Sequence, residues 1–434
     1  MLTRHEHRIE LALVLGVFVL ASVVSQVRQQ PISLNNGQGW DGVTYFHVAD
    51  QFAHHQRPDG EAPFVYRIGT PLLASVVSKS NLLAGFKVVN IAGSLVATLL
   101  FVWWLRFHLT SWKIRVLMTA CFIAMWHAPV RFVYFYPAYA DPWLFVALIA
   151  GLIGIQHAKS HPTVARTGLL GSIVFAGVIF RESALIIAAA FLFSPNPLIQ
   201  PADASAALAH LQVDRLVKRI PLILFVPLAL GLLGLLIVSR AASQTNSYSF
   251  LKTAVEMAYA KPGLTYLHAW FIAFGPIVII VMYHWRDAIR ILANNQSLLI
   301  YLIGFSVLGW IGGSDTERIL FWSAPVVYML IGKVLEDHPA SMGSRPLQIV
   351  LCVSHLISAR VFWTIPDYPS VAKSPLPILT IPSSQGQYYD LYSYFASPRI
   401  QVISLVEYLA LGVVLLWWLN YRAVITRGAH PHRS

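Results

Sequence analysis

The sequence predicts an all-α protein that crosses a membrane as a helical bundle, with about 10–12 crossings. Of its 434 residues, 56% are hydrophobic and 12% are charged, and the mean hydropathy is +0.61. Soluble domains contain about 25% charged residues, so this composition fits a surface that contacts lipid. Apolar runs such as Arg219 to Val238 can span about 30 Å of hydrocarbon, and Leu222 to Leu236 lacks the alternation of a transmembrane strand.

Apolar segments in order along the chain are the expected crossings. Their boundaries are expected to be accurate to about four residues. The segments are Ile9–Val27, Asn81–Leu105, Ile114–Ala128, Pro142–Ile155, Gly168–Phe180, Ser183–Phe193, Ile220–Val238, Tyr266–Tyr283, Ser297–Ile311, Ile319–Val334, Leu347–Thr364 and Ile403–Tyr421.

Basic residues orient this bundle, because connections rich in Lys and Arg stay in the cytoplasm. Both termini are therefore predicted to be cytoplasmic, and the first helix is predicted to stay uncleaved because no small-residue cleavage site follows it. The net charge of +12 is scattered rather than arranged in a stripe, so no nucleic-acid partner is expected. The inner basic residues are Arg106, Lys113, Arg115, Lys159, Arg166, Arg215, Lys218, Arg219, Arg286 and Arg290, with Arg422, Arg427 and Arg433 in the tail.

The stretch Gly168–Phe193 is either one crossing or two short helices that meet at Arg181-Glu182. A single crossing would move Arg286 and the basic tail to the outer side, so the charge distribution favours the hairpin.

No repeat, low-complexity tract or charged linker divides the chain, so residues 1–434 are expected to form one integral membrane domain. Two long segments lie outside the membrane in this topology, at residues 28–80 and 366–399. Cys121 and Cys352 both lie within apolar runs, which is typical of small buried side chains.

Ionisable residues gather at the outer ends of the predicted helices, although they come from separate parts of the chain. Such groups near hydrocarbon are unfavourable by several kcal/mol unless they are paired or hydrated, so their grouping indicates a functional, water-filled cavity. The motifs are Trp40-Asp41-Gly42, Ala140-Asp141-Pro142, Arg181-Glu182-Ser183 and the segment Gly312 to Arg318.

Two aspartates in this group are candidate catalytic residues. Asp41 precedes an apparent helix that contains Tyr45 and His47, two candidate substrate-binding residues. Its carboxylate either acts as a general base or caps that helix. Asp141 precedes Pro142, an arrangement typical of a helix entry, and the same two interpretations apply to it.

The arginines are candidate ligands for a phosphate, because one guanidinium group can donate two parallel hydrogen bonds to two phosphate oxygens. Arg181 and Glu182 form either a mutual ion pair or a phosphate-binding unit, and burial favours function. Asp315 and Arg318 have the spacing of an ion pair on a helix. Arg67 contacts either a lipid-linked phosphate or lipid headgroups, of which headgroups are the simpler expectation.

The first outer segment resembles the GT-C membrane glycosyltransferases, especially their mannosyltransferase-like members. Two stretches carry the resemblance: Trp40-Asp41-Gly42-x-x-Tyr45-x-x-x-Ala49, and Tyr66-Arg67 followed by Pro71-Leu72-Leu73-Ala74. The resemblance implies that Asp41 matches the acid of the first outer loop and Asp141 the acid of the second. The double-acid form of many members is absent, because Gly42 and Val43 follow Asp41. The sequence therefore does not indicate a divalent metal at this site, and no cofactor is assigned.

The resemblance implies an extracytoplasmic hexosyltransferase that moves a sugar from a polyprenyl-phosphate carrier to an acceptor hydroxyl with inversion. The expected partners are the lipid-linked sugar donor, an acceptor that is a glycan, lipid or protein, and the bilayer. The expected location is a bacterial inner (plasma) membrane. One alternative is a transporter or flippase, in which the same residues line a translocation path. Another is a glycan polymerase or ligase whose essential residues are arginines. Matching halves with broken helices are typical of transporters and are not evident here.

Overall fold

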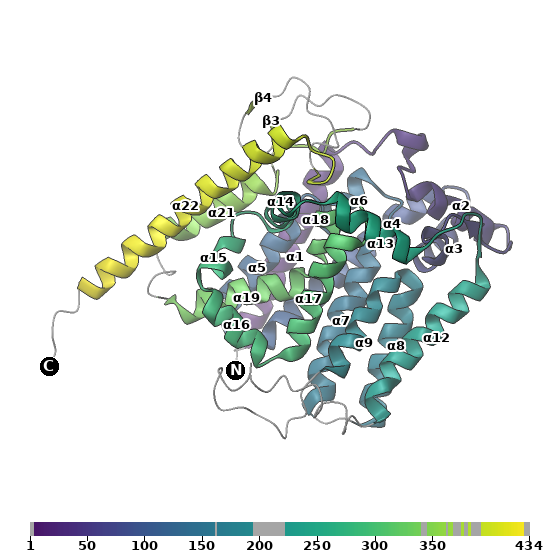
Figure 1. Ribbon diagram of the computed structural model, residues 1–434, viewed down its shortest axis with the longest axis horizontal. Helices are drawn as coiled ribbons and strands as arrows, with labels where there is room; N and C mark the ends of the chain where they lie inside the picture. Colours follow the sequence, from purple (N-terminus) through teal and green to yellow (C-terminus); the bar gives the residue numbers. More distant parts are fainter. Residues whose placement is uncertain are drawn as a thin grey trace.

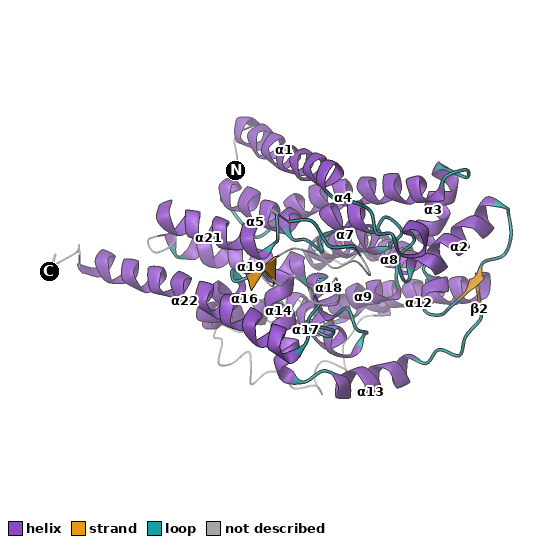
Figure 2. Ribbon diagram, turned by 90° about the horizontal axis from the view of Figure 1, so that it is seen from above, coloured by secondary structure: helices purple, strands orange, loops and turns teal. Residues whose placement is uncertain are grey.

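The computed structural model describes residues 4–160, 163–193, 222–339, 345–361, 363–367, 375–376, 381–382 and 392–428. Regular structure in these residues is almost entirely helical, and the only strands among them are two-residue pairs (Figures 1 and 2). The predicted inner basic residues Arg215, Lys218 and Arg219, the tail residue Arg433 and much of the outer segment 366–399 lie outside the described residues.

The helices and strands follow one another along the whole chain. The α-helices are α1 (Arg4–Arg28), α2 (Gly42–Ala53), α3 (Gly69–Val77), α4 (Leu82–Arg106), α5 (Trp112–Ala124), α6 (Pro129–Phe135), α7 (Asp141–Ser160), α8 (Val164–Phe180), α9 (Leu185–Leu192), α12 (Val226–Ala241), α13 (Phe250–Ala260), α14 (Gly263–Phe274), α15 (Val278–Tyr283), α16 (Trp285–Ala293), α17 (Gln296–Ile311), α18 (Thr316–Phe321), α19 (Ala324–Asp337), α21 (Arg345–Ser358) and α22 (Pro398–Gly428). Short 3₁₀ turns are η1 (Leu34–Gly37), η2 (Phe64–Tyr66), η3 (Glu182–Ala184) and η4 (Leu222–Phe225). Strand β1 (Asp59–Gly60) pairs in parallel with β2 (Ser243–Gln244), and β3 (Pro375–Leu376) pairs antiparallel with β4 (Ile381–Pro382).

The prediction of a polytopic helical membrane bundle is confirmed. Six spans in the described residues are long and apolar enough to cross a membrane, and the pair α16 and α17, bent by 115°, would add a seventh. Shorter apolar helices occupy other predicted crossings, so among the described residues there are fewer full-length spans than the predicted 10–12 crossings. The six are His5–Arg28, Leu82–Arg106, Trp112–Phe135, Asp141–Lys159, Ile223–Ala241 and Pro398–Trp417.

The stretch Gly168–Phe193 forms a helical hairpin. Helix α8 ends at Phe180, and α9 returns beside it after η3; Figure 1 shows α7, α8, α9 and α12 side by side. A Cβ atom at Gly231 of α12 would lie 2.6 Å from the side chain of Leu185 in α9 and 2.8 Å from that of Val174 in α8. Glycine therefore lets α12 pack closely against both arms of the hairpin.

Two predicted crossings are each built from two helices. The predicted segment Tyr266–Tyr283 contains α14 and α15, which are separated at Gly275, where φ is +68°. Glycine adopts this conformation without the steric penalty that other residues meet. The predicted segment Ile319–Val334 likewise contains the end of α18 and most of α19.

A buried ion-pair triad joins helices α1, α4 and α5. Glu10 of α1 accepts hydrogen bonds from Arg106 at the end of α4, at 2.7 Å, and from Arg115 of α5, at 2.5 Å. Glu10 is fully buried, so its charge needs these partners. The triad fixes α1 against α4 and α5.

Candidate functional site

Asp41 stands at the start of α2, but its side chain does not cap the helix. The residue has helical dihedral angles, and its carboxylate makes no hydrogen bond to the first turn. The backbone N–H of Gly42 instead donates to the hydroxyl of Tyr136 at 2.6 Å. The Asp41 side chain is 22% exposed, so its carboxylate remains available to a ligand.

Asp141 lies at the beginning of α7 and is almost completely buried. Its Oδ1 lies 2.5 Å from Nη1 of Arg181, and its Oδ2 accepts a hydrogen bond of 3.2 Å from the indole N–H of Trp322. The guanidinium of Arg181 also stacks over the Trp322 ring at 4.3 Å. Asp141 is therefore anchored on both carboxylate oxygens, whereas Asp41 is not.

Arg318 connects the two predicted aspartates. Its Nη2 lies 3.6 Å from Oδ2 of Asp41, and its Nε lies 3.5 Å from Oδ2 of Asp141. The predicted pair with Asp315 is present, at 2.7 Å between Nη2 and Oδ2. We refer to Asp41, Asp141, Arg181, Asp315 and Arg318 as the carboxylate–arginine cluster.

Arg181 and Glu182 do not pair with each other, although they are adjacent in the sequence. Arg181 has the extended backbone that ends α8 and is directed towards Asp141. Glu182 instead accepts two hydrogen bonds from Arg67, at 2.6 and 3.0 Å. The break between α8 and α9 thus sends two neighbouring charges to partners in different parts of the chain.

Arg67 belongs to a protein-internal ion pair rather than to the lipid surface. It is buried, and its Nη1 also donates to the hydroxyl of Tyr45 at 3.0 Å. Burial lowers the pKa of Arg67, but Glu182 and Tyr45 raise it more, so the pKa lies well above its usual value. Burial raises the pKa of Tyr45, with Arg67 acting against this shift. Both groups therefore keep their usual protonation at neutral pH.

His47 lies apart from the carboxylate–arginine cluster. Its Nε2 lies 2.9 Å from Oδ1 of Asp59, and Gln51 donates to the same oxygen at 2.7 Å. The hydrogen bonds from His47 and Gln51 lower the pKa of Asp59. Both His47 and Asp59 are about half exposed, so this group forms a polar surface beside β1.

Both arginines of the cluster have one N–H group that is free to donate a further hydrogen bond. The Nε atoms of Arg181 and Arg318 are buried and have no hydrogen-bond acceptor within the described ranges. The distance from Arg318 to Asp41 exceeds that of a charge-assisted hydrogen bond. An anionic oxygen that approached Arg318 beside Asp41 would meet a guanidinium with one N–H that makes no hydrogen bond among the described residues, and a partly exposed carboxylate.

Sequence reasoning missed Glu317 and Lys261, which lie beside the cluster. Glu317 is fully buried, and one of its oxygens accepts a hydrogen bond of 2.7 Å from the hydroxyl of Ser393. Burial raises the pKa of Glu317 to about 7. Burial also lowers the pKa of Lys261 to about 8, although Glu317 and Asp315 oppose this. The sequence signal for Glu317 was its place between Asp315 and Arg318, in a segment already selected for its charge.

Tyr136 and Trp322 were also missed, because apolar neighbours in the sequence make each look like an ordinary core residue. Both are buried. Only the structure places Tyr136 against Gly42, and Trp322 in contact with both Asp141 and Arg181.

The three carboxylates of the cluster face the guanidinium of Arg318, but they do not lie close enough together to share a metal ion. Among the described residues, the one group of three potential metal ligands close enough to share an ion is His284, Asp287 and His338, which belongs to other helices. The cluster itself is built from alternating charges, an arrangement suited to positioning an anion and accepting a proton.

No protein-family model matches the chain, and no curated protein matches it. Several solved structures of the oligosaccharyltransferase from the archaeon Archaeoglobus fulgidus resemble it. The structure tethered with an acceptor peptide containing the NVT sequon is 14% identical, with a TM-score of 0.46, over 94% of this chain and 55% of that one. The apo form is 14% identical, with a TM-score of 0.48, over 94% and 56%. The complex with an inhibitory peptide and a dolichol-phosphate is 14% identical, with a TM-score of 0.43, over 94% and 55%.

The chain thus spans about half the length of the structures that it matches. These likenesses assign no family. The chain is a multi-pass helical membrane protein with a network of acidic and basic side chains at one end of its bundle.

Proposed function

We propose that this protein is an extracytoplasmic glycosyltransferase of the GT-C type. In this proposal it transfers one hexose from a polyprenyl-phosphate carrier to a hydroxyl of a glycan, lipid or protein acceptor. The observation that carries the proposal is the position of Asp41: a partly exposed carboxylate that caps no helix and lies 3.6 Å from Arg318. The resemblance of the Trp40–Ala49 and Tyr66–Ala74 stretches supplies the reaction class.

Asp41 would act as the general base. Its carboxylate takes the proton of the acceptor hydroxyl while the oxygen attacks the anomeric carbon, a role that typically contributes about 10²–10⁴-fold to the rate. The bond from the anomeric carbon to the phosphate oxygen breaks, and its electron pair leaves with the polyprenyl phosphate. Attack opposite the leaving group inverts the anomeric configuration.

Arg318 and Arg181 would stabilise the departing phosphate. Negative charge increases on its oxygens as the glycosidic bond breaks, and preorganised cations lower the free energy of that transition state. The Nε–H groups of Arg318 and Arg181 have no hydrogen-bond acceptor among the described residues, so they are suited to this role. Asp141 and Trp322 would be positioning residues, because they hold Arg181 in place.

A sugar-transfer assay with the reconstituted protein tests the proposal. The protein is supplied with a panel of polyprenyl-phosphate sugars and, separately, with the matching nucleotide sugars. Glycosylated acceptor and free polyprenyl phosphate should form in equal amounts from one lipid-linked donor and from no nucleotide sugar. Movement of an unaltered lipid-linked sugar across the bilayer without bond cleavage would instead identify a transporter. Transfer of preassembled oligosaccharides, but not of single sugars, would identify a ligase.

A further inference from the structure

A second group of polar residues lies at the other end of the bundle from the carboxylate–arginine cluster. Helix α19 starts at Ala324, a few residues after Arg318, and ends at Asp337. Its 14 residues span about 21 Å. His338, which follows its last turn, is therefore separated from the cluster by the length of the helix. In the predicted topology this end faces the cytoplasm.

His284 and Asp287 present their side chains from one turn of the chain. His284 precedes α16, and Asp287 lies three residues later in the first turn of that helix. Residues with this spacing share a helix face. The Nδ1 atom of His284 and the Oδ2 atom of Asp287 are 3.6 Å apart.

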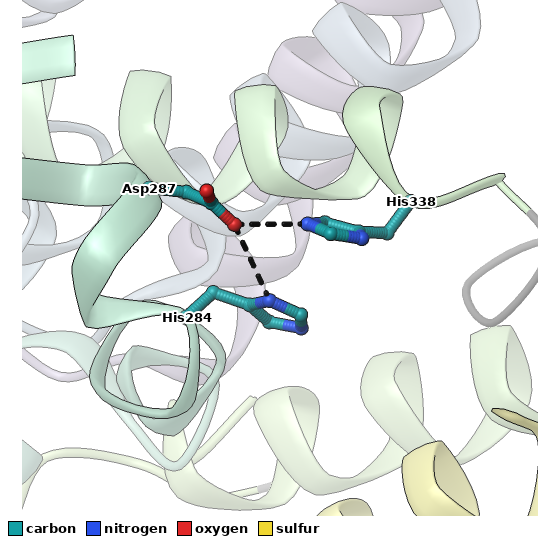
Figure 3. Close-up of side chains that lie close together, drawn as sticks. All are labelled: His284, Asp287 and His338. Atoms are coloured by element: carbon teal, nitrogen blue, oxygen red, sulfur yellow. Dashed lines mark hydrogen bonds and ion pairs between the residues drawn. The ribbon is translucent and has the colours of Figure 1, made fainter. Parts of the chain in front are cut away.

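His338 completes the group from a different helix. Its Nε2 lies 3.0 Å from the same Oδ2 atom of Asp287. Figure 3 shows the two imidazole rings and the carboxylate directed towards one another. One ligand atom from each of the three residues lies within 4.8 Å of the other two.

We infer that His284, Asp287 and His338 bind a divalent transition-metal ion of the Zn²⁺ class. A tetrahedral ion at about 2.0–2.1 Å from its ligands separates them by roughly 3.3 Å, and the observed distances of 3.0 and 3.6 Å bracket this value. Two imidazole nitrogens with one carboxylate favour such an ion over Mg²⁺ or Ca²⁺, which prefer oxygen ligands. The fourth position is left for water or an external ligand.

Arg290 supports this assignment from outside the ligand group. It donates to Oδ1 of Asp287 at 3.0 Å, which leaves Oδ2 as the oxygen that faces both histidines. Hydrogen bonds of this kind orient metal-binding carboxylates. The side chains of His284, Asp287 and His338 are 17%, 27% and 35% exposed, so an ion can reach them from water.

The bound ion would fasten α16 to the end of α19. Helix α16 is bent by 115° from α17, so the two helices do not continue in one direction. The ion would hold this helix in place and would take no part in sugar transfer, which the proposed function assigns to the carboxylate–arginine cluster.

To test this inference, the full chain is purified without a polyhistidine tag and is treated with a chelator to remove bound metal. Titration with Zn²⁺ should show saturable binding of one ion per chain and a rise in the midpoint of thermal unfolding. His338→Asn and Asp287→Asn should each weaken the affinity at least roughly 100-fold, because even supporting residues contribute about 10–100-fold to metal affinity.

His54→Asn is the matched control. His54 also lies beside an aspartate at helical spacing, 3.5 Å from Asp50, but this pair belongs to no group of three ligands among the described residues. Its replacement should leave Zn²⁺ binding unchanged. The absence of one-to-one binding to the unaltered protein, or equal affinity in His338→Asn, would overturn the inference and would leave the proposed glycosyltransferase unaffected.

Discussion

The carboxylate of Asp41 makes no capping hydrogen bond, which excludes one of the two roles that the sequence left open. An aspartate before a helix usually caps it, and the sequence alone supports capping and catalysis equally. The structure shows a carboxylate without a capping bond and Tyr136 bound to the Gly42 N–H. Tyr136 is 94 residues further along the chain than Gly42, and no local sequence pattern could have selected this contact.

Replacing Asp141 by Asn should destabilise the protein by about 3–5 kcal/mol, because it leaves the buried Arg181 without its closest counter-charge. The midpoint of thermal unfolding in detergent measures the loss. The double variant Asp141→Asn/Arg181→Gln should recover part of it, because both charges are then removed together. If the two substitutions were simply additive, the ion pair would not be the cause of the loss.

The buried carboxyl of Glu317 should make stability fall as the pH rises. Burial raises its pKa from 4.5 to about 7, so the protonated form is favoured in the folded state. The raised pKa contributes on the order of 3 kcal/mol to the free energy of unfolding. This contribution is complete below about pH 4.5 and is lost as the pH rises through about 7.

Glu317→Gln should remove this dependence and should unfold at a higher temperature than the unaltered protein at about pH 8. Thermal unfolding at several pH values between about 5 and 8 measures the effect. Parallel pH profiles for the two proteins would contradict the assignment. Glutamine keeps an acceptor for the Ser393 hydroxyl, so the comparison isolates the charge.

At the scale of the elements, the sequence predicted where helices occur better than where they break. The apolar blocks determine the positions of α1, α4, α7 and α12, because burial of backbone hydrogen bonds in lipid requires helices. The breaks depend on distant packing. Gly275, for example, lies where a Cβ atom would be 2.5 Å from the Ser358 hydroxyl, more than 80 residues away.

The first residue of α2 should not tolerate a side chain. A Cβ atom at Gly42 would lie 2.7 Å from the Ala138 carbonyl oxygen and 2.9 Å from the Tyr136 ring. Gly42→Ala should therefore displace Asp41 and lower kcat by roughly 10- to 100-fold, since small misplacements of catalytic groups have effects of this size.

Gly263→Ala is the control for this substitution, because no atom lies within 4 Å of a Cβ at that helix start. It should keep full transfer activity. Full activity in Gly42→Ala as well would show that the start of α2 does not position the catalytic group.

At the scale of the whole molecule, the predicted orientation places the carboxylate–arginine cluster outside and Arg290 inside. In a variant without Cys121 and Cys352, a membrane-impermeant maleimide added to intact cells should label Lys252→Cys in α13. It should label Arg290→Cys only after permeabilisation. Both positions are well exposed, at 78% and 64% of the side chain. The opposite labelling pattern would invert the topology.

The charged network was predictable from the sequence as a grouping, but not as a set of contacts. The sequence placed Asp41, Asp141, Arg181 and Arg318 at the same ends of the predicted helices. We expected them to group there, because charged groups near lipid need partners or water. The pairing of Arg181 with Asp141 required the hairpin between α8 and α9 to form. His47 lies apart from the cluster because helix α2 directs it towards Asp59.

Sugar transfer by the Asp41→Asn variant is the most direct test of the central claim. Reconstituted at equal amounts with the lipid-linked donor, this variant should lose at least roughly 100-fold in kcat, because the amide cannot accept the acceptor proton. Asp50→Asn, an exposed aspartate on the same helix, should transfer at the rate of the unaltered protein. Transfer that persists in Asp41→Asn would contradict the assignment of Asp41 as the base.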